Sequence, residues 1–459
     1  MTMRTRYHLP VWGLFVLALL LPWVSGCDSG SLEEPEITND TFRSYVALGN
    51  SITAGFQANG IVASTQSDSY ANLLAQQMGT SFGLPLLNAP GCPPPVNDIF
   101  TDSFSQQDGG TECALRAAPA PSTVNNVAVP GAQVFDALSN VDPTPGQPEQ
   151  PVTSTNALTQ FVLGGRTQVQ AARQANPTFA TVWLGNNDLL GAALAGVPDT
   201  TNANPSDDLD NFPAPSTPPS LFEQQYRSVI DSLTEAGVQR GVLIAVANPT
   251  LVPNLSPGQA FAAAEGQINS LGQALASDLG AAWGSFETQN CATGAGANVR
   301  VPLSYFFGTI LRNALQGSTS TLNCNPNPQS DPSNAAEPIL TQAEQSAISA
   351  RLTAYNDIIE SVADDKGWVY VDEVNPALQN LYQAGTGDGD PTNDLVPKLP
   401  TPSENSPTFG RYFSEDGVHP SSTTHRVVAH LVIRELNAAY DDVQLEQVSI
   451  PDEVQPLLP

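Results

Sequence analysis

A serine follows a short apolar run early in the sequence. Residues 45–49 read as a buried strand, and the polar residues after them, with Gly55, predict a turn into a helix. In an open parallel α/β sheet, ligands bind at the carboxyl ends of the strands. Ser51 would then present its hydroxyl at that edge, with its N–H near a helix N-terminus. Such a serine can act as nucleophile and oxyanion donor, although a Gly-Asn-Ser turn can equally be a plain helix cap.

A serine nucleophile needs a base, and the sequence beyond its N-terminal segment contains three histidines. His425 and His430 fall within a predicted helix and are expected to be surface or partly packed residues. His419 lies in a loop before that helix, three residues after Asp416. This spacing lets the Asp416 carboxylate bind one ring nitrogen of His419 and leaves the other nitrogen to take the serine proton.

Two further residues follow predicted strands and are candidate donors to an oxyanion. Gly131 offers a backbone N–H after the strand at 124–129, and Asn187 offers a side-chain amide after the strand at 180–184. Both residue types are also ordinary in turns. Because the carboxyl ends of parallel strands meet at one edge, we expect both residues near Ser51.

Strands and helices alternate along the chain, which predicts a parallel sheet covered on both faces. Ser220 and Glu223 predict a capping box at the start of one of these helices. Long segments at 80–122 and 284–337 read as insertions into a single domain at 42–440, followed by a C-terminal tail at 441–459. The predicted strands are residues 45–49, 124–129, 180–184, 241–246 and 368–371.

The N-terminus carries the pattern of an export signal. Arginines precede a short apolar run that ends in Val-Ser-Gly-Cys at Cys27. This ending resembles the lipobox of bacterial lipoproteins, which implies removal of residues 1–26 and lipidation of Cys27; the alternative is an ordinary signal with a coincidental cysteine. Residues 27–41 read as an acidic tether. We therefore expect an exported lipoprotein anchored in a membrane, at the outer membrane or cell surface.

The cysteines predict disulfides rather than a metal site. With Cys27 lipidated, an even number remains in an exported protein, namely Cys92, Cys113, Cys291 and Cys324. Three pairings are possible, of which 92–113 and 291–324 are the local ones. No CxxC or histidine cluster accompanies these cysteines, so no zinc site is expected.

The composition is strongly acidic, with 16 Lys and Arg against 45 Asp and Glu and a formal net charge of −29. Such a surface repels nucleic-acid phosphates, so a nucleic-acid partner is excluded. It suits a salt-rich, halophilic setting, where salt screens the repulsion between acidic groups, although plain solubility is an equal explanation.

Four short blocks together resemble the SGNH or GDSL-type serine hydrolases. They occur in the family's order: Gly49-Asn50-Ser51-Ile52-Thr53-Ala54-Gly55, Asn126 to Gly131, Gly185-Asn186-Asn187-Asp188 and Asp416-Gly417-Val418-His419. The resemblance implies a flavodoxin-like three-layer α/β/α fold with a mainly five-stranded parallel sheet. It also implies Ser51 as nucleophile, His419 as base and Asp416 as its partner, with Ser51, Gly131 and Asn187 in the oxyanion hole. Asn50 departs from the aspartate usual in the family.

These observations lead to one expected function and one alternative. We expect a lipid-anchored serine esterase or lipase that hydrolyses esters of acyl lipids or acylated sugars, without metal or cofactor. The long loops would form an apolar acyl-binding cleft or a groove for a polymer. The alternative is a catalytically idle surface lipoprotein that binds glycan or lipid in the same cleft.

Overall fold

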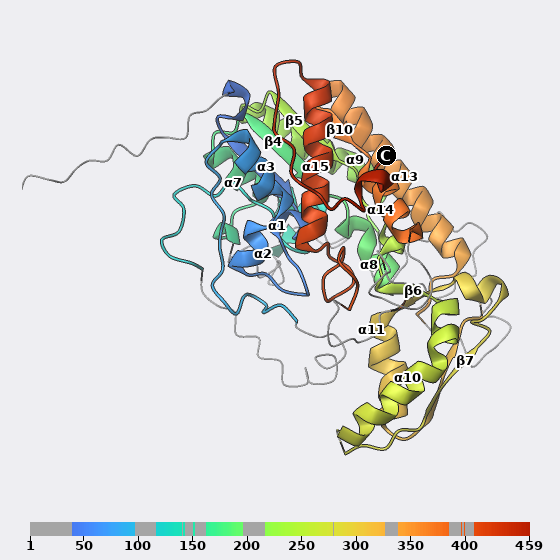
Figure 1. Ribbon diagram of the computed structural model, residues 1–459. Coiled ribbons are helices and arrows are strands. Elements are labelled where there is room, and N and C mark those ends of the chain that lie inside the picture. The colour runs from blue at the N-terminus through green and yellow to red at the C-terminus, as the bar shows by residue number, and fades with distance from the viewer. Residues whose placement is uncertain are drawn as a thin grey trace, which may run out of the picture. The chain divides into compact units, whose positions relative to one another are not determined.

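The computed structural model (Figure 1) describes residues 39–96, 116–139, 141–142, 150–151, 162–195, 216–278, 280–325, 338–384, 396, 399 and 408–459. Residues 37–459 form one compact unit. The predicted signal peptide, the lipidation site Cys27 and Cys113 lie outside the described residues. No helix among the described residues combines the length and apolar character needed to cross a membrane.

Parallel strands form the central sheet, in the order β1-β4-β5-β10 within the described residues. They are β1 (Tyr45–Gly49), β4 (Phe179–Trp183), β5 (Arg240–Ile244) and β10 (Val369–Val371). Tyr45 pairs with Phe179, Phe179 with Arg240, and Val369 with Val242. Strands β1 and β4 are buried along their whole length, as expected of a parallel sheet covered on both faces.

The segment predicted as the second strand runs beside β1 without becoming a regular strand. Ala47 donates its N–H to Asn125 (2.9 Å), Val127 donates to Ala47 (2.9 Å) and Val129 donates to Gly49 (3.2 Å). The Asn125 side chain meanwhile donates to Tyr45 O (2.8 Å), so asparagine side chains compete with the backbone pairing. If this segment is counted as the second strand in sequence, the strands lie in the spatial order 2-1-3-4-5 across the sheet. This order is flavodoxin-like. The predicted fold class is confirmed, with this strand reduced to an irregular edge.

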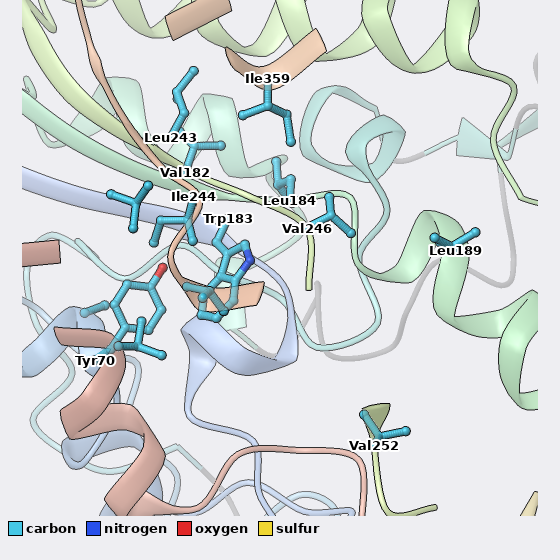
Figure 2. Close-up of a cluster of buried hydrophobic side chains, with 14 of the residues drawn as sticks. Tyr70, Val182, Trp183, Leu184, Leu189, Leu243, Ile244, Val246, Val252 and Ile359 are labelled. Carbon is cyan, nitrogen blue, oxygen red and sulfur yellow. The ribbon is translucent and has the colours of Figure 1, made fainter. Parts of the chain in front are cut away.

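Helices cover both faces of the sheet. On one side α3 packs against α15, and on the other α9 packs against α5, α7 and α13. Figure 2 shows Tyr70 of α3 on one side of the strands that carry Val182 and Leu243, and Ile359 of α13 on the other. The bounds are α1 (Ser51–Ala54), α2 (Ala63–Ser67), α3 (Tyr70–Met78), α5 (Val134–Leu138), α7 (Gln168–Gln174), α8 (Asn187–Ala195), α9 (Pro219–Glu235), α13 (Gln342–Lys366), α14 (Val374–Gln383) and α15 (Ser422–Ala439).

The capping box predicted at Ser220 is wrong. Helix α9 begins one residue earlier, with Pro219 in its first turn and no side-chain cap. Proline is suited to that position because its fixed φ is helical and its missing N–H would have had no partner there. Glu223 instead forms an ion pair with Arg227 one turn later (2.9 Å).

Residues 255–325 form a lobe that starts earlier than the insertion predicted at 284–337. Its first helix, α10, packs against β7, which ties the two parts of the lobe together. The disulfide Cys291–Cys324 closes the lobe, and it is one of the two local pairings that the sequence left open. Cys92 is also disulfide-bonded, while Cys113 is outside the described residues. The elements are β6 (Leu255–Pro257), α10 (Gly258–Asp278), β7 (Ser285–Gln289), β8 (Arg300–Pro302), α11 (Leu303–Tyr305), α12 (Arg312–Leu315) and β9 (Thr319–Asn323). The short strands β2 (Val141–Asp142) and β3 (Gln150–Pro151) pair elsewhere.

His425 is fully buried between α15 and α3, contrary to the expected surface or partly packed position. Its Nδ1 accepts the Tyr70 N–H at the start of α3 (3.2 Å). Burial, together with the charge of nearby His419, lowers the pKa of His425 from 6.5 to about 3. His425 therefore joins two helices in its neutral form.

We expect His425 to make the protein less stable as the pH falls. Between about pH 6.5 and pH 3 the unfolded chain binds a proton that folded His425 does not, so the free energy of unfolding decreases by up to about 1.4 kcal/mol per pH unit. Asp188 acts in the opposite direction, since burial raises its pKa from 3.8 to about 6. When the pH is lowered from 7 to 4.5, the melting temperature should decrease more in the wild type than in His425→Gln.

Asp188 is present in both of these proteins, so their difference isolates His425. The control is His430→Gln, at a partly exposed position on the same helix. Parallel melting curves for the wild type and His425→Gln would contradict the prediction.

Candidate active site

Ser51 is the first residue of α1, directly after the sharp turn that ends β1. The Asn50 side chain caps α1 by accepting the Ile52 N–H (3.1 Å). Gly49 is required because a Cβ there would lie 2.1 Å from Thr53 Oγ1. The Gln168 side chain both donates to Gly49 O (2.9 Å) and accepts from Gly49 N (3.0 Å). Backbone and side-chain contacts thus fix the position of Ser51, which is buried at 6% exposure.

Asp416 and His419 form a direct pair. His419 Nδ1 lies 2.7 Å from Asp416 Oδ2, while Oδ1 of the same carboxylate accepts the backbone N–H groups of Val418 and His419, both at 2.8 Å. Burial favours the neutral carboxyl, but the charge of His419 and these hydrogen bonds prevail and lower the pKa of Asp416 to about 2. Asp416 is therefore a carboxylate at neutral pH, and it orients the imidazole.

A tight turn after α1 holds this pair. Gln57 and Gly60 exchange backbone hydrogen bonds (2.9 and 3.0 Å), and the two residues between them, Ala58 and Asn59, have φ of 53° and 55°. Positive φ at both central residues is the type I′ geometry. It directs the Asn59 N–H to Asp416 Oδ2 (2.7 Å) and the Ala58 N–H to Ser414 Oγ (2.9 Å). Non-glycine residues held in this strained region often lie at functional sites.

Two further contacts support the loop that carries the pair. Asn254 donates its side-chain amide to Asp416 O and its backbone N–H to Gly417 O, both at 2.9 Å. Gly417 has φ of 66°, and a Cβ on it would lie 2.6 Å from the Phe409 ring. The Phe56 ring packs against His419 with centroids 4.9 Å apart.

Ser51 and His419 line the same cavity, whose volume is about 100 Å³. Among the described residues no hydrogen bond joins Ser51 Oγ to His419 Nε2; such bonds often tighten only when substrate is bound. The polar residues of the lining are Asn50, Ser51, Asn186, Asn187, Asn248, His419 and Thr424. The apolar ones are Ile52, Trp183, Leu190, Ala247, Pro249, Val252, Val374, Ala377, Leu378, Leu381, Phe413, Val418, Pro420, Val427, Val428 and Leu431.

The candidate oxyanion donors are not equally placed. Asn187 lines the cavity, and its Nδ2 donates to Ala132 O (2.9 Å), which leaves its second N–H available. Gly131, one residue before Ala132, is exposed and is not part of the lining among the described residues. The structure therefore brings Ser51 and Asn187 to one cavity, and Gly131 is next in sequence to Ala132, which accepts from Asn187.

Two asparagines that the sequence did not single out as donors also reach this cavity. Asn186 Oδ1 accepts the Ala247 N–H (2.9 Å), while its Nδ2 is buried without a partner among the described residues. The Nδ2 of Asn50 is likewise buried without a hydrogen-bond partner among the described residues. An aspartate, usual in the family at position 50, would carry no such donor. The feature of the sequence that could have indicated Asn186 as a donor is its position next to Asn187, directly after a predicted strand.

The neighbouring Asp188 has a structural place in the motif. Its carboxylate accepts the Thr217 hydroxyl (2.7 Å) and the Val134 N–H (3.1 Å), and it is fully buried. The first of these bonds joins the start of α8 to the segment before α9, and the second joins it to the start of α5. They hold the segment after Gly131 close to Asn187.

The sequence predicts an apolar cleft formed by the long loops, but much of the apolar wall comes from helices. Helix α14, which is not among the predicted helices, supplies a large part of it, and α15, the predicted last helix, supplies most of the rest. The signal in the sequence was an apolar spacing of three and four residues from Val374 to Leu381. Pro376, in the first turn of α14, obscures it, although proline is tolerated there.

A hydroxyl, a carboxylate-backed imidazole and amide donors around one cavity are the groups that acyl transfer requires. Two solved structures show a distant likeness to the chain. An acetylxylan esterase from Geobacillus stearothermophilus, solved as a catalytic mutant, is 10% identical; the match covers 87% of this chain and 95% of that chain, with a TM-score of 0.30. A phospholipase A1 from Streptomyces albidoflavus is 13% identical, with 86% and 98% covered and a TM-score of 0.32. Likeness this distant does not assign a substrate.

No curated protein sequence matches the chain significantly. The family model for GDSL-like lipases and acylhydrolases matches it from residue 45 to residue 432. This range contains all four sequence blocks, and the predicted family is confirmed. Because the match spans most of its length, the chain belongs to the GDSL-like lipase/acylhydrolase family of carboxylic ester hydrolases.

Proposed function

We propose that Ser51 is the nucleophile and His419 the general base of this ester hydrolase. The observation that carries the proposal is the Asp416–His419 pair at 2.7 Å, on a loop that places His419 in the same cavity as Ser51. With Nδ1 occupied by the carboxylate, the Nε2 nitrogen takes the proton of the Ser51 hydroxyl as it attacks the ester carbonyl.

The reaction then follows two steps. In the first, the Ser51 oxygen bonds to the carbonyl carbon, the ester C–O bond breaks, and His419 returns the proton to the departing alcohol. In the second, His419 takes a proton from water, whose oxygen bonds to the acyl carbon. The bond from that carbon to the Ser51 oxygen then breaks, His419 returns the proton to this oxygen, and the carboxylic acid is released. Asp416 stays ionised throughout and stabilises the imidazolium formed in each step.

We assign the oxyanion donors to the Ser51 N–H and the Asn187 side chain, with Gly131 N–H as the third predicted member. The first two lie on the cavity that holds the nucleophile. The carbonyl oxygen gains negative charge in both steps, and donors fixed in advance stabilise it without reorganisation.

We also propose that the enzyme is exported and held at a membrane by a lipid on Cys27. The support is the sequence pattern of residues 1–27 and the acidic tether after it. Several acyl chains on one residue suffice for stable anchoring. The acidic, lysine-poor composition supports a salt-rich setting.

Ser51→Ala should lower kcat for p-nitrophenyl ester hydrolysis by about 10⁴-fold or more, because no other group replaces the nucleophile. Initial rates with purified protein measure this loss. The matched control is Ser44→Ala, which removes a hydroxyl bonded to Ala175 O (2.7 Å) at the opposite end of β1. Equal rates for the wild type and Ser51→Ala would rule out the proposed mechanism.

Ser414→Ala should lower kcat by about 10- to 100-fold with little change in KM. Its hydroxyl accepts from Ala58 N and donates to Asp416 Oδ1 (3.1 Å), so its loss loosens the carboxylate that orients His419. Ser414→Thr keeps the hydroxyl and should recover most of kcat. A loss confined to KM, or an equal loss in Ser44→Ala, would contradict a positioning role.

Cys27→Ser should move the protein from the membrane fraction to the soluble fraction when the full chain is expressed in a bacterial host. Without the thiol there is no site for the lipid. Incorporation of labelled palmitate, followed by fractionation, measures the change, and Ser31→Ala in the tether serves as the control. Membrane retention of Cys27→Ser would show that something other than Cys27 anchors the protein.

A further inference from the structure

Helix α14 presents an apolar stripe to the cavity. Val374, Ala377, Leu378 and Leu381 all line it, at a spacing that places them on one face of the helix. Three of the four side chains are buried, with Leu378 partly exposed. A stripe of this kind normally packs against another element.

Helix α15, drawn in red beside α14 in Figure 1, presents a matching stripe to the same cavity. Thr424, Val427, Val428 and Leu431 repeat the same spacing and line the same cavity. Facing stripes of two helices usually interdigitate to the density of a protein interior. Here they instead line part of a cavity whose whole volume, including the part beside Ser51, is about 100 Å³.

The C-terminal segment fixes the separation of the two helices. On α15, His430 Nδ1 bonds to Val448 O (3.1 Å) and Asn437 Nδ2 donates to Leu445 O (2.9 Å). On α14, Asn380 Nδ2 donates to Leu457 O (2.8 Å). One segment is therefore bonded to both helices, and the space between their stripes is built into the fold.

The lining changes character from one end to the other. The helical stripes are almost wholly apolar, whereas Ser51 and Asn187 are the first residues of α1 and α8 and His419 lies in the loop before α15. An ester with its carbonyl at Ser51 would therefore extend an alkyl chain between α14 and α15. Because the acyl part remains bonded to Ser51 through both steps while the alcohol leaves after the first, a chain of the acyl part gains most from this space.

We propose that the cavity between α14 and α15 is the acyl-chain site and that the enzyme is selective for esters of aliphatic acids with short to medium chains. The proposal rests on the proposed function. An apolar cavity of about 150 Å³ holds benzene, so about 100 Å³ holds about four carbon atoms. Each methylene buried there raises kcat/KM by about fourfold until the space is filled.

The test compares p-nitrophenyl acetate, butyrate, hexanoate and laurate. In the wild type kcat/KM should rise from acetate to hexanoate and gain nothing further at laurate. Ala377→Leu adds three carbon atoms to the wall and should lower the hexanoate-to-acetate ratio of kcat/KM at least tenfold. Leu378→Ala widens the space and should shift the preference to laurate. Ala438→Leu, the same substitution at an exposed position of α15, should leave the ratio unchanged.

Ala377→Leu reduces the volume of the cavity and Leu378→Ala increases it. If one of these variants does not fold, the other still tests the proposal. A wild type that hydrolyses all four esters equally, or a ratio unmoved in folded Ala377→Leu and Leu378→Ala, would overturn the acyl-chain site and leave the esterase standing. A second series of methyl, butyl and hexyl acetates should not respond to Ala377→Leu; a response there would place the alcohol in the cavity instead.

A readout without turnover separates this proposal from the proposed function. In the Ser51→Ala protein, 1-hexanol should raise the melting temperature, and Ala377→Leu added to it should abolish the rise. No hydrolysis of any ester by the wild type would defeat the proposed function alone. The absence of a hexanol shift would defeat the cavity assignment.

Discussion

The site depends on one buried carboxylate. Asp416 accepts hydrogen bonds from Ser414, Asn59, Val418 and His419, the last through both its backbone and its ring. A buried charge left unpaired would cost several kcal/mol, so the loop that carries it and the turn after α1 cannot move apart cheaply. Ser51 is the first residue of α1, and the turn that follows α1 donates to Asp416. The hydrogen bonds that keep Asp416 ionised therefore also fix the position of His419 relative to Ser51.

The parts of the fold that repeat a local pattern could be predicted from the sequence. The strand before Ser51 is an uninterrupted apolar run, and the Asp416–His419 pair depends on a spacing of three residues. Asn187 follows a regular strand and lines the cavity. Gly131 follows a segment in which an asparagine side chain bonds to β1 in place of regular strand pairing, and it is not among the residues that line the cavity. Position after a strand predicts a place on the sheet edge but not which groups face inward.

What sequence reasoning missed depends on contacts between distant segments. The full burial of His425 arises because α15 packs against α3, where Tyr70, 355 residues earlier, donates to its ring. The cavity likewise forms only where α14, α15 and the C-terminal segment come together. The sequence of any one of these segments does not predict a space between the helices. Natural proteins commonly keep such loosely packed sites where activity needs the space.

A chain that lies between α14 and α15 is still there when the ester bond has been cut, now as the tail of a free acid. Its apolar contacts are unchanged, so on their own they would hold the acid as firmly as the ester. The head group is what differs, because a neutral ester has become an anion. In a protein of formal net charge −29, the surrounding field disfavours that anion and does not act on the ester. At low ionic strength, where this field is least screened, the acidic exterior thus opposes retention of the acid by the apolar interior.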